Sequence, residues 1–450
     1  MYATRIATLV LAALSLCAAT PPNAEKTIDE LFRPVAGRES PGAAVAVVRN
    51  GRVIFMKAYG MADVANGVDN SPGTIFRLAS ITKTFTAVAV LQLIEGGKLK
   101  LEDPLSKYIV DFPNANKISI SHLLSHTAGV ADFIPYEELK KRPLEFEPGS
   151  RISYSNNGYS LLGRVIEEVS GQPWDEYLRD HIFLPLGMKH TGYDRTQELA
   201  GRATGYHAGA DGRYQPIAPQ DALGAYAGGG LYSTVEDMVR WEDGLSSGKL
   251  LHKETLDRAS TPGVLTDGRR TVYGLGWMTT NYRGLREVGH GGDITGFNTY
   301  YARYPDAGLS VIVLSNVGMR PPGPLPVSAD LAHRIAEIWL EGRMQTRDAL
   351  PEVKVATAAL QSYTGRYRLD APAVIIQNMG SHIVITRQGD RLMAEANGMK
   401  LPLLARSETV FQAPGSPAEL TFVCGGRERC PKVVVTLMGL REFPALRVEE

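Results

Sequence analysis

Apolar residues recur at helical spacing in the segment that follows Ser80. They fall every three or four positions from Phe85 to Ile94, and Gly96-Gly97 then ends the pattern. This spacing predicts a helix that begins at or just after Ser80 and ends at the two glycines. The same kind of spacing predicts helices over residues 120–128, 158–169 and 327–340, and a short helix near residue 28.

Other apolar runs have the pattern of strands. Ala43–Arg49 and Arg52–Tyr59 are separated by Asn50-Gly51, a dipeptide that strongly favours a hairpin turn. Further strands are predicted over residues 274–280, 297–304 and 309–315, with the glycine-rich segment 289–296 beside a sheet edge. Because these strands come from distant parts of the chain, we expect one sheet covered by helices, an α+β fold.

The pattern changes after Glu341. Residues 346–357 are mixed and polar, include Pro351 and are typical of a linker. Short alternating strands follow, predicted at residues 363–369, 374–377, 383–387, 392–395, 420–423 and 433–437. They indicate a small antiparallel β-domain over residues 358–450, of barrel or sandwich type. We find no grouping of acid and base side chains in this part of the sequence.

The composition is that of an ordinary globular protein. Of 450 residues, 44% are hydrophobic and 21% are charged, and this length allows two or three domains. Lys+Arg and Asp+Glu are equal at 48 each. A nucleic-acid-binding protein is therefore not expected, because binding to phosphates requires a basic surface.

The first residues have the pattern of an export signal. Arg5 precedes the apolar stretch Ile6–Ala19, which is short for a membrane span. We expect residues 1–24 to be a cleaved signal peptide, a mature chain without a transmembrane segment, and a periplasmic or secreted protein. A lipoprotein anchor at Cys17 is the alternative, but the bulky Leu16 stands where such signals have small residues.

Two cysteines remain in the mature chain, Cys424 and Cys430, and they flank a Gly-Gly pair. In an oxidising compartment such a close pair favours a disulfide at a hairpin tip. A zinc site is the alternative, but no second pair of ligands accompanies them.

Ser80 and Lys83 are three residues apart, so their side chains share one helix face. A serine hydroxyl needs a neighbouring base to act as a nucleophile. Lysine can be that base only if burial or a nearby cation lowers its pKa from about 10.4. The start of a helix also offers free backbone N–H groups to an oxyanion.

A second S-x-x-K occurs at Ser246 and Lys249, and Ser246 also lies in a G-x-S-x-G pattern. A nucleophile of that type needs a strand before the serine and a helix after it. Here an amphipathic helix runs into a Gly/Ser turn, so we interpret Ser246 as the end of a helix.

His122 and His126 are four residues apart and could place two zinc ligands on one helix face. No H-E-x-x-H glutamate and no third ligand accompany them, which favours structural hydrogen bonding. Tyr154 and Asn156, just before a predicted helix, are by themselves consistent with an ordinary turn and cap.

Three short motifs occur in order along the chain: Ser80-x-x-Lys83, Tyr154-Ser155-Asn156 and His290-Gly291-Gly292. Together with segments 120–130 and 227–234, they resemble the serine β-lactamase and penicillin-binding-protein superfamily. The resemblance is closest to class C β-lactamase-like esterases and D-amino-acid peptidases, and it covers about residues 25–345. The tail resembles the lipocalin-like β-domain of some members.

The resemblance implies an α/β domain with an antiparallel sheet beside a helical subdomain, about residues 85–225. It implies an acyl-enzyme on Ser80, formed without cofactor or metal, with Lys83 and Tyr154 sharing the proton transfers. Either of the two could be the base. Asn156 would bind Lys83 or a substrate amide. The backbone N–H groups of Ser80 and Asp293 would form the oxyanion hole.

The third motif departs from the penicillin-specialised members, which have K-T-G where this chain has His290-Gly291-Gly292. Histidine is only partly charged at neutral pH, so a substrate carboxylate would lose a fixed cation. Asp293 adds an acidic side chain nearby. Efficient β-lactam hydrolysis is therefore not expected, and a small ester or peptide fits as well.

Three hypotheses follow for the function. The first is an exported serine hydrolase that cleaves an amide or ester in a small-molecule or peptide substrate, such as a β-lactam, a D-amino-acid peptide or a small ester. The second is a non-catalytic envelope module that binds or senses on the same fold. The third is a zinc hydrolase that uses His122 and His126. The sequence does not specify an oligomeric state.

Overall fold

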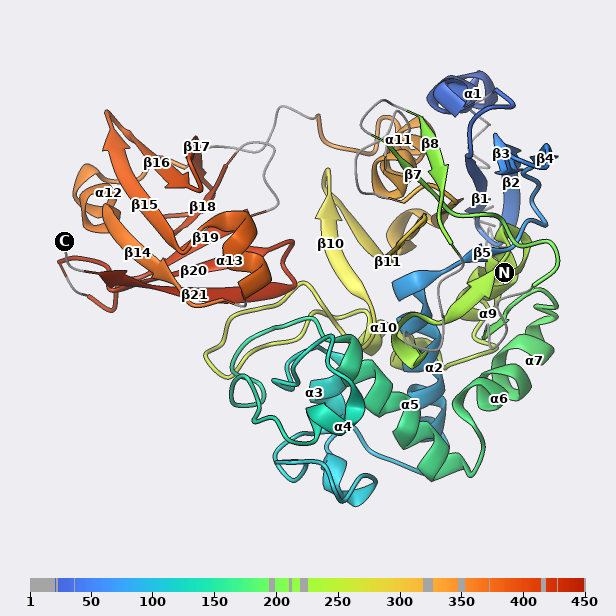
Figure 1. The fold of residues 1–450 in the computed structure, drawn as a ribbon, viewed down its shortest axis with the longest axis horizontal. Helices are drawn as coiled ribbons and strands as arrows, with labels where there is room; N and C mark the ends of the chain where they lie inside the picture. The colour runs from blue at the N-terminus through green and yellow to red at the C-terminus, as the bar shows by residue number, and fades with distance from the viewer. Residues whose placement is uncertain are drawn as a thin grey trace, which may run out of the picture.

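The computed structural model describes residues 21, 23–35, 37–193, 199–209, 213–218, 226–318, 327–346, 353–371, 373–413, 418–426 and 428–448. The apolar stretch of the expected signal peptide, with Cys17, lies outside the described residues, and so does Pro351 of the expected linker. Figure 1 shows a larger mixed α/β part and, on one side of it, a smaller part made mainly of strands.

A six-stranded antiparallel sheet forms the centre of the larger part, in the order β10-β11-β12-β13-β1-β2. Its strands are β1 (Ala43–Arg49), β2 (Arg52–Tyr59), β10 (Met278–Tyr282), β11 (Leu285–Ile294), β12 (Phe297–Tyr304) and β13 (Leu309–Ser315). Strand β1 pairs with β13, with Ala43 opposite Ser315. The prediction of one sheet from distant parts of the chain is confirmed.

Helices cover both faces of this sheet, and alternate residues of β1 point to each. Val45 and Val47 are buried in the core beneath α1 (Ala24–Phe32) and α11 (Ser328–Leu340). Ala44 and Ala46 belong to the core on the opposite face, with α2 (Thr82–Glu95) and α9 (Val235–Ser246). The continuous apolar pattern of β1 follows from this burial on both faces.

Helix α2 is buried along most of its length, and the larger part contains further helices. They are α3 (Ile120–Leu124), α4 (Tyr136–Leu139), α5 (Asn156–Ser170), α6 (Trp174–Leu178), α7 (Leu184–Leu186), α8 (Tyr226–Gly229) and α10 (Lys253–Ala259). The helix predicted over residues 120–128 is shorter than expected, because His126 adopts the left-handed φ of 59° and lies outside α3.

The glycine-rich segment 289–296 is not merely beside a sheet edge, since its residues up to Ile294 are the second half of β11. The glycines allow close approach of other backbone. A Cβ on Gly289 would lie 2.1 Å from the Tyr301 carbonyl oxygen, and one on Gly292 would lie 2.2 Å from that of Leu78. Gly292 therefore lets β11 pass directly beside the segment that leads to Ser80.

The smaller part is a closed eight-stranded barrel. Its strands are β14 (Gly365–Leu369), β15 (His382–Gln388), β16 (Arg391–Ala396), β17 (Met399–Ala405), β18 (Val410–Gln412), β19 (Ala418–Val423), β20 (Lys432–Leu437) and β21 (Arg441–Val448). It also carries α12 (Thr357–Tyr363) and α13 (Ala373–Met379). The strand predicted at residues 374–377 is wrong, because that short apolar run lies within α13, and periodicity does not separate the two over four residues.

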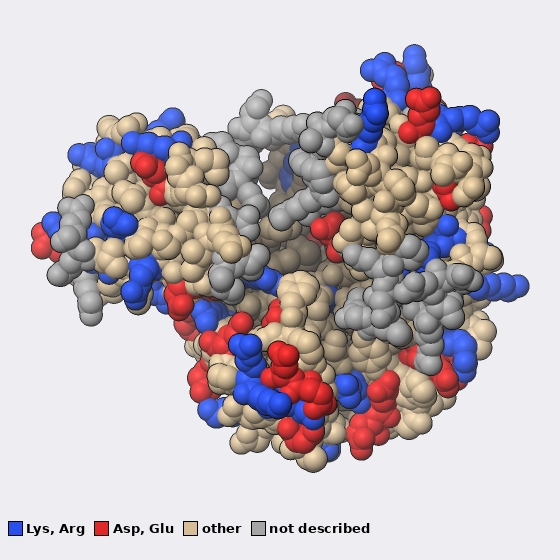
Figure 2. Space-filling view, viewed as in Figure 1, with Lys and Arg blue, Asp and Glu red and all other residues tan. Residues whose placement is uncertain are grey.

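Cys424 and Cys430 are joined by a disulfide that links the end of β19 to the segment before β20. None of the helices in the described ranges is both long enough and apolar enough to cross a membrane. Acidic and basic side chains are interspersed over the face shown in Figure 2.

Candidate active site

Ser80 lies in the 3-10 turn η2 (Ala79–Ile81), directly before α2. The preceding strand β5 (Phe76–Arg77) pairs with β9 (Leu231–Ser233), and the Leu78 N–H donates to the Leu231 carbonyl at 2.9 Å. Ala79 has the left-handed φ of 49°, which is unfavourable for a residue with a Cβ. The serine thus projects from a constrained strand-to-helix turn.

Lys83 follows Ser80 by one helical turn and is completely buried. Its Nζ donates to Ser80 Oγ at 3.2 Å, to Asn156 Oδ1 at 2.6 Å and to the Gly228 carbonyl at 2.6 Å. All three acceptors are neutral, so burial is the main influence and lowers the pKa of Lys83 to about 7. At neutral pH much of this amine is unprotonated and able to accept a proton.

Tyr154 completes the contacts around the serine hydroxyl. Its hydroxyl hydrogen-bonds Ser80, and its ring centroid lies 4.6 Å from Lys83 Nζ. The Tyr154 ring also packs on His126, with 4.2 Å between centroids. Burial raises the pKa of Tyr154 above 10, so the phenol remains protonated at neutral pH and can donate a proton.

Asn156 is the first residue of α5, and the N-cap Ser155 accepts from the Gly158 N–H at 3.0 Å. Asn156 is therefore within the helix and not in the loop before it. Its backbone N–H and side-chain amide donate to Asp132, at 2.7 and 3.2 Å. Sequence reasoning missed Asp132, because no motif marks a single acidic residue 24 positions away.

His290 is buried on β11 and is held on both ring nitrogens. Its Nδ1 lies 2.6 Å from the Gly291 carbonyl and its Nε2 lies 2.8 Å from the Tyr273 hydroxyl. A carbonyl only accepts, so Nδ1 carries the proton and Nε2 accepts from Tyr273. Burial, followed by the nearby Lys83, lowers the pKa of His290 to about 3. The expectation of partial charge at neutral pH is wrong, since this imidazole is neutral.

Gly291, Gly292 and Asp293 occupy the end of β11. Strand β10 pairs with β11 only as far as Gly289, and η2 contacts β11. Gly292 abuts the Leu78 carbonyl, and the side chain of Asp293 is exposed. The structure thus brings the third motif beside the turn that carries Ser80.

The two histidines proposed as a zinc pair have separate structural roles. His122 Nδ1 accepts from the Ser119 N–H at 3.2 Å at the start of α3, and His126 Nδ1 accepts from the Ser155 N–H at 3.1 Å. Within the described ranges, no three His, Cys, Asp or Glu side chains are grouped as metal ligands.

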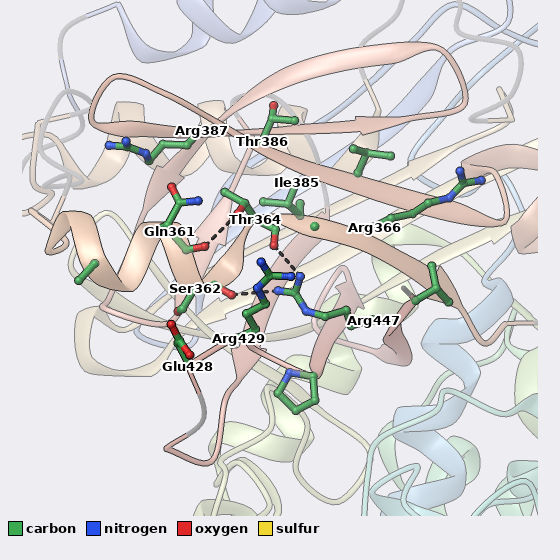
Figure 3. Close-up of a pocket in the computed structure, with 15 residues that line it drawn as sticks. Gln361, Ser362, Thr364, Arg366, Ile385, Thr386, Arg387, Glu428, Arg429 and Arg447 are labelled. Atoms are coloured by element: carbon green, nitrogen blue, oxygen red, sulfur yellow. Dashed lines mark hydrogen bonds between the residues drawn. The ribbon is translucent and has the colours of Figure 1, made fainter. Parts of the chain in front are cut away.

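A cavity of about 1330 Å³ lies on the barrel and not at Ser80. Figure 3 shows Arg366, Arg387, Arg429 and Arg447 among its lining residues. The Arg447 guanidinium is directed at the carbonyls of Thr364 and Ser362, at 2.7 and 2.9 Å. It therefore holds barrel segments together, and the cavity shares no residue with the cluster around Ser80.

Comparisons with known proteins support the family resemblance. Residues 28–334 match the family model described as Beta-lactamase. Putative penicillin-binding protein PbpX of Bacillus subtilis is 32% identical over 282 residues, which are 60% of this chain and 69% of that protein. Penicillin-binding protein 4* of the same organism is 27% identical over 446 residues, covering 90% of this chain and 94% of that protein.

The crystal structure of D-amino acid amidase from Ochrobactrum anthropi, complexed with D-phenylalanine, has a TM-score of 0.62 and 25% identity. The match covers 72% of this chain and 100% of that chain. Since the family model matches more than half of the residues, the protein belongs to the β-lactamase family of serine hydrolases, which is related to the penicillin-binding proteins.

Proposed function

We propose that the protein is a serine hydrolase that cleaves an amide or ester through an acyl-enzyme on Ser80. The observation that carries the proposal is the Lys83 amine, which is buried among neutral acceptors, lies 3.2 Å from Ser80 Oγ and has a pKa of about 7. A base whose pKa is near the working pH is partly unprotonated and still has a high affinity for a proton.

These pKa values support one assignment of the proton transfers. Ser80 Oγ attacks the carbonyl carbon and passes its proton to Lys83 Nζ. Tyr154, which stays protonated at neutral pH, gives a proton to the departing amine or alcohol and is reprotonated from Lys83. A water molecule then cleaves the acyl-enzyme by the reverse transfers. The N–H groups of Ser80 and Asp293 would stabilise the oxyanion.

The neutral state of His290 indicates which substrates the site can bind. A β-lactam presents a carboxylate, and the K-T-G lysine that binds it in penicillin-specialised members is replaced here by an imidazole whose pKa is about 3. A D-amino-acid amide or a short ester has no such carboxylate and needs no cation at this position. The relation to D-amino acid amidase supports such a substrate.

Three expectations from the sequence accompany this proposal. Residues 1–24 would be removed on export to the periplasm or the medium. Residues 25–345 would form the hydrolase domain. Residues 346–357 would link it to the barrel domain at 358–450.

A fluorophosphonate probe tests the proposal, since it forms a stable adduct with an activated serine. Peptide mass mapping should locate one adduct on Ser80 and none in Ser80→Ala, while Ser246→Ala labels normally. Turnover of D-phenylalanine amide and of p-nitrophenyl acetate would then identify the leaving group. Absence of an adduct on the folded wild-type chain would support the non-catalytic binding module instead.

A further inference from the structure

The β20–β21 turn of the barrel lies against the loop that carries Tyr154. The Tyr154 N–H donates to the Leu440 carbonyl at 2.9 Å, and the Glu442 N–H donates to the Ile152 carbonyl at 3.2 Å. Ser153 and Arg441 form an antiparallel bridge. The barrel therefore adds a short strand to this loop, in the manner of an added sheet edge. In Figure 1 the strands β20 and β21 extend toward the larger part.

The turn itself is fitted to this contact. Gly439 has a φ of 70°, and a Cβ there would lie 2.6 Å from Val272 Cγ2. Next to it the Glu442 carboxylate pairs with the Arg269 guanidinium. Both partners, Val272 and Arg269, precede β10 in the larger part. The contact thus combines backbone pairing, close packing and an ion pair.

The side chain of Arg441, directly after this turn, contacts residues next to the cluster around Ser80. Its Nη2 donates to Asp132 Oδ2 at 2.7 Å and to the Tyr154 carbonyl at 3.1 Å. The side chain of Arg441 is 28% exposed and that of Asp132 is 10% exposed. Removing one member of such a partly desolvated pair leaves the other charge without its partner.

Asp132 is linked to Lys83 through the side chain of Asn156. Its two oxygens accept from the backbone and side-chain N–H groups of Asn156, at 2.7 and 3.2 Å. The remaining atom of that amide, Asn156 Oδ1, accepts from Lys83 Nζ at 2.6 Å. Two residues, Asp132 and Asn156, therefore connect the barrel arginine to the amine beside Ser80.

We propose that Arg441 of the barrel is a positioning residue for acylation, which fixes Asp132 and Asn156 so that the Lys83 amine faces Ser80. This inference rests on the proposed function. In this proposal the barrel contributes a residue that positions the side chains around Ser80.

Charge gives the proposal a measurable consequence. Asp132 raises the pKa of Lys83 and Arg441 lowers it, so the two charges oppose each other. The other titratable groups near Lys83 carry no charge at neutral pH: Tyr154 and Tyr159 are protonated, and His126 and His290 are neutral. Without Arg441, the Asp132 carboxylate acts on Lys83 unopposed.

The test measures the rate of fluorophosphonate labelling of Ser80 against pH in the full chain. In Arg441→Ala we expect a labelling rate about tenfold lower at pH 7. The rising part of the plot of rate against pH, the acid limb, should move to higher pH. In Asp132→Asn we expect a lower rate with the limb moved to lower pH. The double variant should return the limb toward that of the wild type, and Arg387→Ala, an exposed barrel arginine, should behave as wild type.

Circular dichroism establishes that each variant is folded. Should Arg441→Ala fail to fold, Asp132→Asn carries the test, and an unchanged rate and limb in that variant would overturn the inference. A folded Arg441→Ala with the rate and limb of Arg387→Ala would overturn it as well. Failure of the proposed function has a different signature, the absence of any Ser80 adduct in the wild-type chain.

Discussion

The chain contains the same four-residue pattern twice, and the two copies lie in opposite surroundings. At Ser80 and Lys83 the hydroxyl and the amine are 3.2 Å apart, and the lysine is completely buried. At the second copy the Lys249 side chain is 60% exposed and pairs with Asp243 at 2.9 Å. The spacing of serine and lysine alone therefore does not determine the surroundings of the lysine.

The second serine is bound in a structural network. Ser246 is the last residue of α9, donates to the Glu242 carboxylate and accepts from Arg303 Nη2 at 3.1 Å. Arg303 and Glu242 form an ion pair whose side chains are 9% and 6% exposed. Burial, and not the four-residue pattern, lowers the pKa of Lys83 to about 7.

Replacement of the two serines should give the largest contrast. Ser80→Ala removes the proposed nucleophile and should lower kcat by about 10⁴-fold or more. Ser246→Ala removes only hydrogen bonds at the end of a helix, so its kcat should equal that of the wild type. Turnover of the substrate found in the labelling experiments measures both. Equal losses in the two variants would remove the distinction between the copies.

Replacement of the two lysines should give the next largest contrast. Lys83→Met removes the proposed base from a buried position and should lower kcat/KM by about 10²- to 10⁴-fold. Lys249→Met breaks an exposed ion pair and should leave kcat/KM unchanged. Steady-state kinetics on folded protein provides the measurement. Full activity of Lys83→Met would transfer the role of base to Tyr154.

The network around Ser246 should affect stability and not chemistry. Arg303→Met leaves the Glu242 carboxylate buried without its partner, which should lower the free energy of unfolding by about 3–5 kcal/mol. Urea unfolding measures this loss, with Lys249→Met as the exposed control. Ser80 should still be labelled at the wild-type rate in the folded variant. Slow labelling together with normal stability would contradict this assignment.

Much of the fold could be predicted where local signals agree. The bounds of β1 and β2 follow from two apolar runs around Asn50-Gly51, and β12 and β13 follow from a similar pattern. The order of the three short motifs predicted the cluster of Ser80, Lys83 and Tyr154. The strand signals are local in the sequence. The site signal comes from the order of the three motifs along the chain, which resembles that of a known family.

The remainder depends on contacts that no local pattern records. Glycines usually indicate a turn, yet in β11 they allow Gly292 to approach the Leu78 carbonyl. Arg441 and Asp132 are 309 residues apart and belong to no motif. The neutral state of His290 results mainly from burial, which a short motif does not record.

The pH dependence of Ser80 labelling in the wild-type chain shows whether the buried Lys83 amine accepts the serine proton. Lys83 must be unprotonated to accept the serine proton, and its pKa is about 7. The rate should therefore rise with pH, reach half of its maximum near pH 7 and level off above it. A rate that keeps rising toward pH 10, where an exposed lysine titrates, or one that does not depend on pH, would contradict the account.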